Sequence, residues 1–210
     1  MPTPSSPTNK RQNVAETAIR SPDAALAGLS QLAAKPTHGP APVHLWNPPD
    51  CGDIDMRIAA DGTWYYCGSP IGRTPLVKLF SSILRKDGDR FVLVTPVEKV
   101  GIKIDDAPFL AVEMAVEREA NEQTLTFRTN VDDLVIVDQD HPLRFEPGAA
   151  EGLKPYVRVR GDLWALVKRA LFYDLAALGT TEQFGDRQWF GVRSRRRFFP
   201  MCPASEINGL

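Results

Sequence analysis

Residues 55–68, DMRIAADGTWYYCG, decide the fold. Two strand-like runs in this stretch flank Asp61-Gly62, the dipeptide that most readily supplies the positive φ angles of a tight hairpin turn. The stretch therefore predicts an antiparallel β-hairpin, and the segments on either side are interpreted as further elements of the same folded body.

A helix is predicted just after this hairpin. Thr74 and Pro75 open the helix, and Gly88 ends it after the basic residues Arg85 and Lys86. The apolar residues between them share one stripe of a helix, at Leu76, Leu79, Phe80, Ile83 and Leu84. The spacing therefore predicts an amphipathic helix that begins at Thr74 and continues to the residues before Gly88.

Strands are predicted through the middle of the chain. The run FVLVTPVEKVGIKI (91–104) predicts two strands bent near Pro96. β-Branched alternation and polar turns then predict an antiparallel meander over FLAVEMAVERE (109–119), QTLTFRTN (123–130) and DLVIVDQ (133–139).

The end of the chain repeats the order strand, helix, strands. YVRVRG (156–161) predicts a strand, Asp162 can cap a helix that runs to about Leu178, and residues 189–201 predict a last hairpin. Four residues recur ninety positions later, as the pairs Tyr66 and Tyr156, Leu76 and Leu166, Val77 and Val167, and Lys78 and Lys168. Chance similarity between two amphipathic helices is the alternative, but the shared order of elements favours duplication.

These elements predict an α+β fold of duplicated strand-helix-strand units, each with an antiparallel, half-barrel-like sheet. We expect four segments: a disordered tail (1–20), a helix and proline-rich connector (21–45), an N-terminal α+β unit (46–107) and a C-terminal α+β unit (108–210). A cleft between two such units is a preferred place for a ligand.

The composition limits the function classes. The chain of 210 residues has a formal net charge of -1 and a pI of about 6.3, so we expect no nucleic-acid partner. The three cysteines lack paired metal-type spacing, which favours reduced thiols over a disulfide framework or a zinc site. The sequence has no signal-peptide core and no apolar run long enough to span a bilayer, so we expect a cytoplasmic protein.

Several strings in a fixed order point to one family. They are CGDIDMRI (51–58), DGTWYYCGSPIGR (61–73), LVKLFSSILR (76–85), LVTPVEK (93–99), LTFRTN (125–130) and FYDL (172–175). With them, the body from Trp46 to Met201 resembles the bacterial domain of unknown function 1285 family. The resemblance implies a bacterial protein with a duplicated core and a C-terminal part superficially like pleckstrin-homology folds. It also implies a nucleotide-like ligand between the halves and a role in signalling.

Five polar residues are candidates to line the cleft. Arg73 precedes the first helix, whose N-terminus offers free N–H groups to an anion, although Arg73 could instead pair with a carboxylate in an ordinary turn. Arg128 and Asn130 end the strand TLTFRTN and suit a carboxylate or phosphate, or form a solvated strand end. Tyr156 and Arg160 share a strand face, which is either the wet side of a sheet or the wall of a ligand cleft.

Three other features support weaker hypotheses. The arginines of the last hairpin suit a contact with an acidic partner or a solvated turn; they are Arg193, Arg195, Arg196 and Arg197. Asp53 and Asp55 lie two apart on a strand, but no third ligand is tied to them, so no metal site is predicted. Cys67 has no histidine paired with it in sequence, so no catalytic residue is predicted and no cofactor is identified.

The leading hypothesis is a ligand-binding or sensing module. It would hold a small anionic ligand between its two units, against Arg73, Arg128, Asn130, Tyr156 and Arg160. The alternative is a protein-interaction module that docks an acidic partner through the arginine hairpin. An enzyme that depends on magnesium or on a thiol is least favoured, because the sequence contains no recognised catalytic motif.

Overall fold

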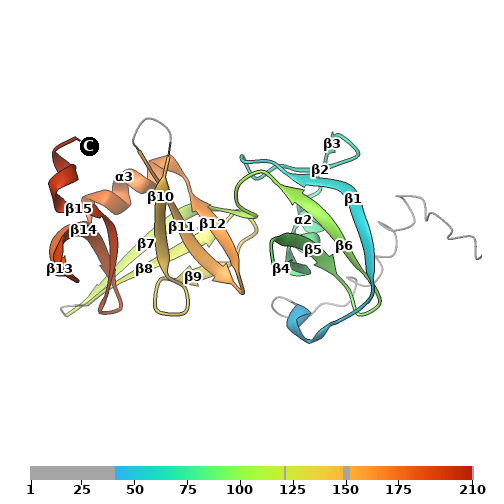
Figure 1. Ribbon diagram of the computed structural model, residues 1–210, viewed down its shortest axis with the longest axis horizontal. Helices are drawn as coiled ribbons and strands as arrows, with labels where there is room; N and C mark the ends of the chain where they lie inside the picture. The colour runs from blue at the N-terminus through green and yellow to red at the C-terminus, as the bar shows by residue number, and fades with distance from the viewer. Residues whose placement is uncertain (1–40, 121, 149–151, 210) are drawn as a thin grey trace, which may run out of the picture.

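A computed structural model describes residues 41–120, 122–148 and 152–209 (Figure 1). Three sheets follow one another along its long axis, from β1–β6 at one end to β13–β15 at the other (Figure 1). The predicted tail (1–20) and the predicted helix and connector up to residue 40 lie outside the described residues.

The N-terminal unit is a six-stranded sheet with one helix. A 3₁₀ turn, η1 (Val43–Leu45), leads into β1 (Asp50–Ile58), β2 (Trp64–Tyr66), β3 (Ser69–Pro70), α2 (Thr74–Ser82), β4 (Leu84–Asp87), β5 (Arg90–Val94) and β6 (Lys99–Ile104). The strand order is β3-β2-β1-β6-β5-β4, with β1 and β6 parallel. The predicted hairpin is confirmed, since Ile58 faces Trp64 across it and Gly62 has a φ of 81°.

The predicted helix after this hairpin begins at Thr74 but ends earlier than expected. It stops at Ser82, and Leu84 to Asp87 form β4, which pairs with β5. The hydroxyls of Ser81 and Ser82 donate back to carbonyls of their own helix, a competition that weakens helices from within. Gly88 makes the turn between β4 and β5 with a φ of 59°, so its role is a hairpin and not a helix end.

The second unit is also a six-stranded sheet. Its strands are β7 (Phe109–Glu119), β8 (Glu122–Thr129), β9 (Leu134–Ile136), β10 (Leu143–Pro147), β11 (Leu153–Arg160) and β12 (Leu163–Val167). The meander predicted over 109–139 is confirmed as β7, β8 and β9. The sheet order is β10-β11-β12-β7-β8-β9, with β12 and β7 parallel, and the sheet curls so that β9 contacts β11 (Figure 1).

The two sheets share one strand order. Counted within its own unit, each sheet runs 3-2-1-6-5-4, with the first and last strands parallel at the centre. The four recurring residues do not mark equivalent elements, however. Leu76 and Val77 lie in α2, whereas Leu166 and Val167 lie in β12. The two units therefore share a strand order, but the four matched residue pairs do not occupy equivalent positions in that order.

The second predicted helix begins later than expected. Asp162 caps no helix, because Leu163–Val167 is a strand that pairs with both β11 and β7. Its side chains alternate in burial, with Leu163, Ala165 and Val167 inside, which is the period of a strand and not of a helix. The helix α3 covers only Arg169–Ala177.

The C-terminal part is a three-stranded sheet. It contains β13 (Thr180–Phe184), β14 (Arg187–Ser194) and β15 (Arg197–Pro203), followed by the 3₁₀ turn η3 (Ala204–Gly209). The predicted hairpin over 189–201 is confirmed as β14 and β15, and β13 was not predicted. The described residues are thus mostly sheet with two nine-residue helices, which does not confirm the α+β class.

One apolar core connects the sheets and helices. Buried side chains from five elements belong to the same cluster; examples are Met56 of β1, Phe80 of α2, Phe109 of β7, Leu175 of α3 and Val192 of β14. None of the helices in the described part of the chain is long and apolar enough to cross a membrane. Because the core is shared, changes at the junction of the units affect the stability of the whole.

We predict that Gly62→Ala destabilises the protein more than Gly88→Ala. Both glycines have positive φ, where an L-residue costs roughly 1–2 kcal/mol. A Cβ at Gly62 would also lie 2.9 Å from Leu110 Cδ1 and 3.0 Å from Asn130 Nδ2 of the second unit, whereas a Cβ at Gly88 meets no atom within 4 Å. Urea unfolding of both variants measures the difference, and equal losses would show that the hairpin does not press on the second unit.

Candidate functional site

A groove of about 490 Å³ lies where the two units meet. One wall is β4 of the first unit, the other is the turn between β11 and β12, and the chain just before β1 borders both. The lining residues are Ala41, Pro42, Val43, His44, Leu84, Arg85, Lys86, Arg160, Gly161, Asp162 and Leu163. The groove therefore has aliphatic walls with three permanent cations and one carboxylate.

Arg160 crosses the junction from the end of β11. Its Nη1 donates to Asp133 at 2.6 Å, and its Nη2 donates to the carbonyl of Ser81 in the first unit at 2.6 Å. The guanidinium also lies over the ring of Phe109, 4.9 Å from its centroid. Its Nε is buried and has no hydrogen-bond partner among the described residues. Arg160 thus links both units and lines the groove.

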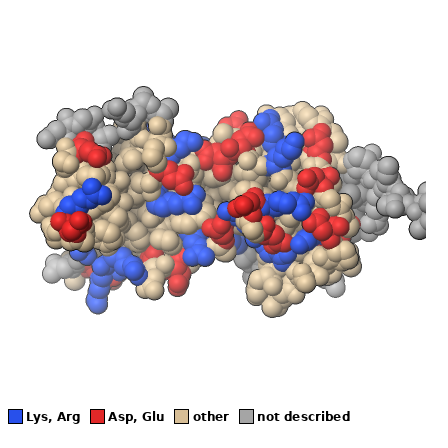
Figure 2. Space-filling view, in the orientation of Figure 1, with Lys and Arg blue, Asp and Glu red and all other residues tan. Residues whose placement is uncertain are grey.

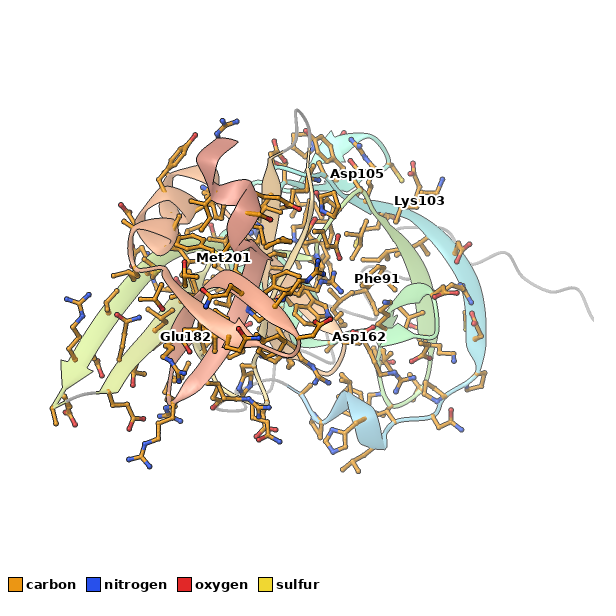
Figure 3. All side chains as sticks on the ribbon, turned by 60° about the vertical axis from the view of Figure 1, so that its left-hand side comes forward. Phe91, Lys103, Asp105, Asp162, Glu182 and Met201 are labelled. Carbon is orange, nitrogen blue, oxygen red and sulfur yellow. The ribbon has the colours of Figure 1, made fainter. Side chains whose placement is uncertain are left out.

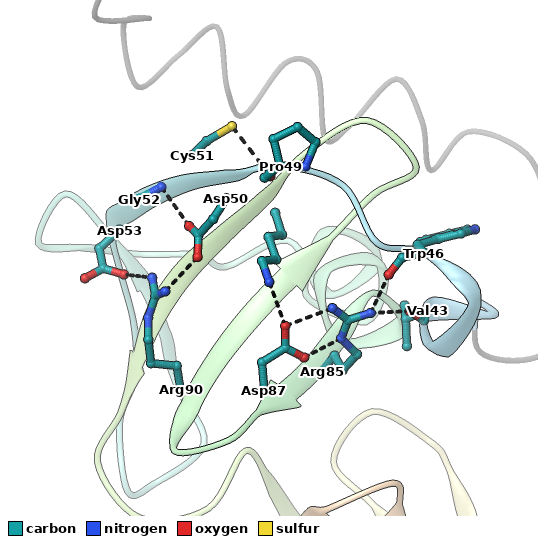
Figure 4. A network of polar contacts seen from close by, with 11 residues as sticks. Val43, Trp46, Pro49, Asp50, Cys51, Gly52, Asp53, Arg85, Asp87 and Arg90 are labelled. Atoms are coloured by element: carbon teal, nitrogen blue, oxygen red, sulfur yellow. Dashed lines mark hydrogen bonds and ion pairs between the residues drawn. The ribbon is translucent and has the colours of Figure 1, made fainter.

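Arg85 fixes the chain that borders the groove (Figure 4). It forms two bonds to the carboxylate of Asp87, at 2.6 and 2.9 Å, and donates to the carbonyls of Val43 and Trp46 at 2.6 and 2.7 Å. Lys99 also reaches Asp87, at 3.0 Å. These donors, Arg85 first, hold the pKa of the Asp87 carboxyl below its ordinary value. The guanidinium of Arg85 is therefore engaged by acceptors of the protein itself.

Lys86 and Asp162 face each other across the groove. The ammonium of Lys86 lies 2.8 Å from the carboxylate of Asp162 and 5.7 Å from the centroid of the Phe91 ring. Phe91 and Asp162 both lie at the junction (Figure 3). Bonds from Lys86 and then from the indole of Trp164 lower the pKa of Asp162. The side chain of Asp162 is 57% exposed, so the carboxylate can leave Lys86 at little cost.

A second ionic link joins α2 to the second unit. Lys78 of α2 bonds to Asp132, which also accepts from Arg128 at 2.6 Å. The Nε of Arg128 donates to Glu113 at 2.7 Å, and its Nη2 donates to the same carboxylate. The predicted ligand residue Arg128 is therefore neutralised by two carboxylates of the protein. Its binding role stays a prediction, and the contacts point to a structural one.

Two more predicted ligand residues are engaged inside the second unit. The side-chain oxygen of Asn130 accepts from the backbone N–H of Leu110 at 3.0 Å, beneath the turn at Gly62. Tyr156 is buried, and its hydroxyl donates to Asp106 in the segment between β6 and β7 at 2.6 Å. Burial first, and then this carboxylate, raises the pKa of Tyr156. Both residues support the junction from within.

Arg73 lies apart from the groove. It is the exposed residue before α2, and no hydrogen bond or ion pair joins its side chain to a residue in the described part of the chain. The structure therefore brings Arg128, Asn130, Tyr156 and Arg160 to the junction, places only Arg160 in the groove wall, and leaves Arg73 outside.

The residues behind the three weaker hypotheses lie in ordinary surface environments. Asp53 pairs with Arg90, and no group of three or more metal-ligating side chains occurs in 41–120, 122–148 and 152–209. Cys67 is exposed. Three arginines of the last hairpin pair with carboxylates of the protein: Arg193 with Glu182, Arg195 with Asp138 and Arg196 with Glu122. This pairing resembles an ordinary charged surface, and Lys, Arg, Asp and Glu are interspersed on the face shown in Figure 2.

The groove residues Arg85, Lys86 and Asp162 were not predicted as site residues. The basic pair was interpreted as the end of a helix and Asp162 as the cap of another. A signal was present, because Gly88-Asp89 and Gly161-Asp162 are both Gly-Asp, a dipeptide typical of two-residue hairpin turns. Predicting two hairpins here would have placed Lys86 and Asp162 at or beside turns, and not in helices.

We predict that Asp106→Asn lowers stability at neutral pH by about 1.5–3 kcal/mol, the range for hydrogen bonds to charged groups. Burial alone raises the pKa of Asp106, but bonds from Lys154 and Tyr156 outweigh it and leave the pKa lowered. The carboxylate therefore stabilises the fold above its ordinary pKa, and this contribution is lost as pH falls through the lowered pKa. Urea unfolding at neutral and acid pH tests this, with exposed Asp89→Asn as control; a loss independent of pH would contradict it.

Comparisons with known proteins identify the family. The N-terminal domain of DUF1285, a domain of unknown function, matches residues 41–107, and the C-terminal domain of DUF1285 matches residues 108–201. No curated protein matches the chain. The crystal structure of a DUF1285 family protein from Silicibacter pomeroyi DSS-3 is 50% identical, with a TM-score of 0.77, over 86% of this chain and 97% of that chain. One from Shewanella baltica OS155 is 30% identical, with a TM-score of 0.45, over 57% of this chain and 87% of that one. The chain belongs to the DUF1285 family.

Proposed function

We propose that the protein is a ligand-binding module that holds a small anionic molecule in the groove between its two units. The observation that carries the proposal is the charge of the groove wall, where Arg85, Lys86 and Arg160 outnumber the single carboxylate of Asp162. Arg85 and Arg160 are held by protein acceptors. Lys86 is paired with one exposed carboxylate, that of Asp162, beside the ring of Phe91, and it is the cation that a ligand anion can take over.

The ligand has a polar and an apolar part. The exposed Pro42 and the half-buried Ala41 and Val43 form an apolar wall beside the cations, so a ligand body of low polarity gains from burial there. A carboxylate or phosphate on that body would replace Asp162 at Lys86. Nucleotides satisfy this description, with a flat base and a phosphate, and so do small aromatic acids.

Binding at this place would report on the arrangement of the units. The walls come from different units, and a molecule between them favours the arrangement in which both walls reach it. We propose this coupling as the basis of a sensing role in signalling. A pleckstrin-homology-like architecture of the C-terminal part and a cytoplasmic location belong to the same proposal.

The proposal predicts a selective rise in thermal stability with one class of anion. The purified protein is unfolded with nucleotides, dinucleotides, inositol phosphates and small acids, with and without magnesium. A ligand at a hundred times its Kd adds about 2.7 kcal/mol. Lys86→Met, which keeps the aliphatic stem, should weaken binding about tenfold or more by removing a charge-assisted hydrogen bond.

Lys103→Met is the matched control, because Lys103 is exposed on β6 outside the groove lining. It should leave the stabilising shift intact. A shift that survives Lys86→Met unchanged would place the ligand elsewhere. The absence of a shift across the whole panel would reject the proposed function.

A further inference from the structure

The stretch SPDAALAGLSQLA (21–33) has the sequence pattern of an amphipathic helix and lies outside the described residues. Ser21 can cap such a helix, and Pro22 suits its first turn. Three leucines recur at helical spacing, at Leu26, Leu29 and Leu32. Isolated helices of about this length are marginal in water, and Gly28 in the middle lowers the helix propensity further. The pattern therefore indicates that an apolar surface covers the leucines.

The first unit exposes apolar side chains at the end where the described chain begins. Among its described residues, the exposed large hydrophobic side chains are Leu45, which is 72% exposed, and Val97, which is 64% exposed. Leu45 ends η1, and Val97 lies in the turn between β5 and β6. This turn lies beside the chain that follows η1, because the N–H of Lys99 donates to the carbonyl of Pro49 at 3.0 Å. Both segments are at the lower end of the first unit in Figure 1.

Two exposed prolines extend this apolar area. They are Pro49, between η1 and β1, and Pro96, next to Val97 in the turn. We call four residues the entry surface: Leu45, Pro49, Pro96 and Val97. Trp46 is half-buried and packs against the core, so the backbone beside Leu45 is held in place. The lower end of the first unit is mostly tan in Figure 2, so an apolar helix face can cover it at little cost in desolvated charge.

We propose that residues 22–33 of this chain form a helix that packs its leucines on the entry surface. The chain folds tightly after Ala41, whose carbonyl accepts from the N–H of Val43 at 2.7 Å, and this turn keeps Leu45 close to the start of the described chain. Residues 34–40 can bridge at most about 25 Å when fully extended. The short tether therefore keeps the leucines near the entry surface and favours it over the exposed hydrophobic side chains of the other sheets.

The docked helix would also hold one wall of the groove between the units. Residues 41–43 line this groove and connect to the helix through residues 34–40. Arg85 holds the same stretch through the carbonyls of Val43 and Trp46, as Figure 4 shows. The helix would fix the stretch from its N-terminal end. The inference is independent of the proposed function, because it concerns the packing of the chain on itself and involves no ligand.

Hydrogen exchange of the full chain without ligand, followed by mass spectrometry, tests the inference. Amides of residues 22–33 should exchange at least about tenfold more slowly than in an unfolded chain, because a docked helix opens rarely. Leu45→Asp and Val97→Asp should each remove most of this protection by placing a charge against the leucines. Leu134→Asp is the matched control and should leave the protection unchanged, because Leu134 is also 72% exposed but lies on β9 of the second unit.

Leu29→Asp tests the contact from the side of the helix. This variant should lose the protection of residues 22–33, and exchange in residues 43–46 should become faster because the entry surface loses its cover. Gln31→Glu changes the opposite face of the predicted helix and should behave as the wild-type protein does.

Rapid exchange throughout residues 22–33 in the wild-type protein would overturn the inference. So would protection that survives both Leu45→Asp and Val97→Asp, or protection that Leu134→Asp removes to the same extent. Protection that falls on dilution would show that the segment packs on a second copy and not on its own chain. If a surface variant fails to fold, Leu29→Asp decides, because unchanged exchange in residues 43–46 of that variant would place the helix elsewhere.

Discussion

The guanidinium of Arg160 is the contact on which the junction of the two units depends. It connects Asp133 of its own unit to the backbone of Ser81 at the end of α2, and its position over Phe109 fixes it at the start of the central strand β7. Its side chain is only 20% exposed, so losing either acceptor would leave a poorly solvated charge. The groove keeps its shape because this cation has partners in both units.

Around Arg160, more exposed ion pairs also hold the two units together. Lys78 and Lys86 bridge from the first unit to Asp132 and Asp162 of the second, and Tyr156 secures the connecting segment through Asp106. Exposed pairs contribute little to stability, typically 0.2–1 kcal/mol each. These pairs instead fix where the side chains lie. Asp162 holds the Lys86 ammonium beside the groove, and an incoming anion can replace the Asp162 carboxylate there.

Much of the fold could be predicted from local signals. Asp61-Gly62 placed the first hairpin, and alternation placed the meander of β7, β8 and β9. Both helices were predicted too long for the same reason. The stretches around Leu84 and Leu163 contain apolar residues that fit a helical stripe when tertiary contacts are ignored. In the fold they enter sheets, where pairing with β5, β7 and β11 outweighs helix propensity.

The site could be predicted only in part. Arg160 was predicted to line a ligand cleft, and it lines the groove. Arg128 and Asn130 looked free in sequence because Glu113 and Leu110 are distant along the chain and the contact of Arg128 with nearby Asp132 was not recognised. Lys86 was missed because its partner Asp162 is seventy-six residues away. Sequence patterns report neighbours along the chain, whereas the pairings of Arg128 and Asn130 arise within the second unit and that of Lys86 arises from the docking of the two units. The strand order common to both sheets was likewise visible only once the pairing was known.

Hydrogen exchange, followed by mass spectrometry with and without the most stabilising anion, tests the central claim most directly. Backbone amides that a ligand covers or fixes open less often and exchange more slowly. The account predicts slower exchange in residues 41–46, 84–87 and 160–163, which together border the groove. Protection confined to other segments, or no protection under conditions where the anion stabilises the protein, would contradict it.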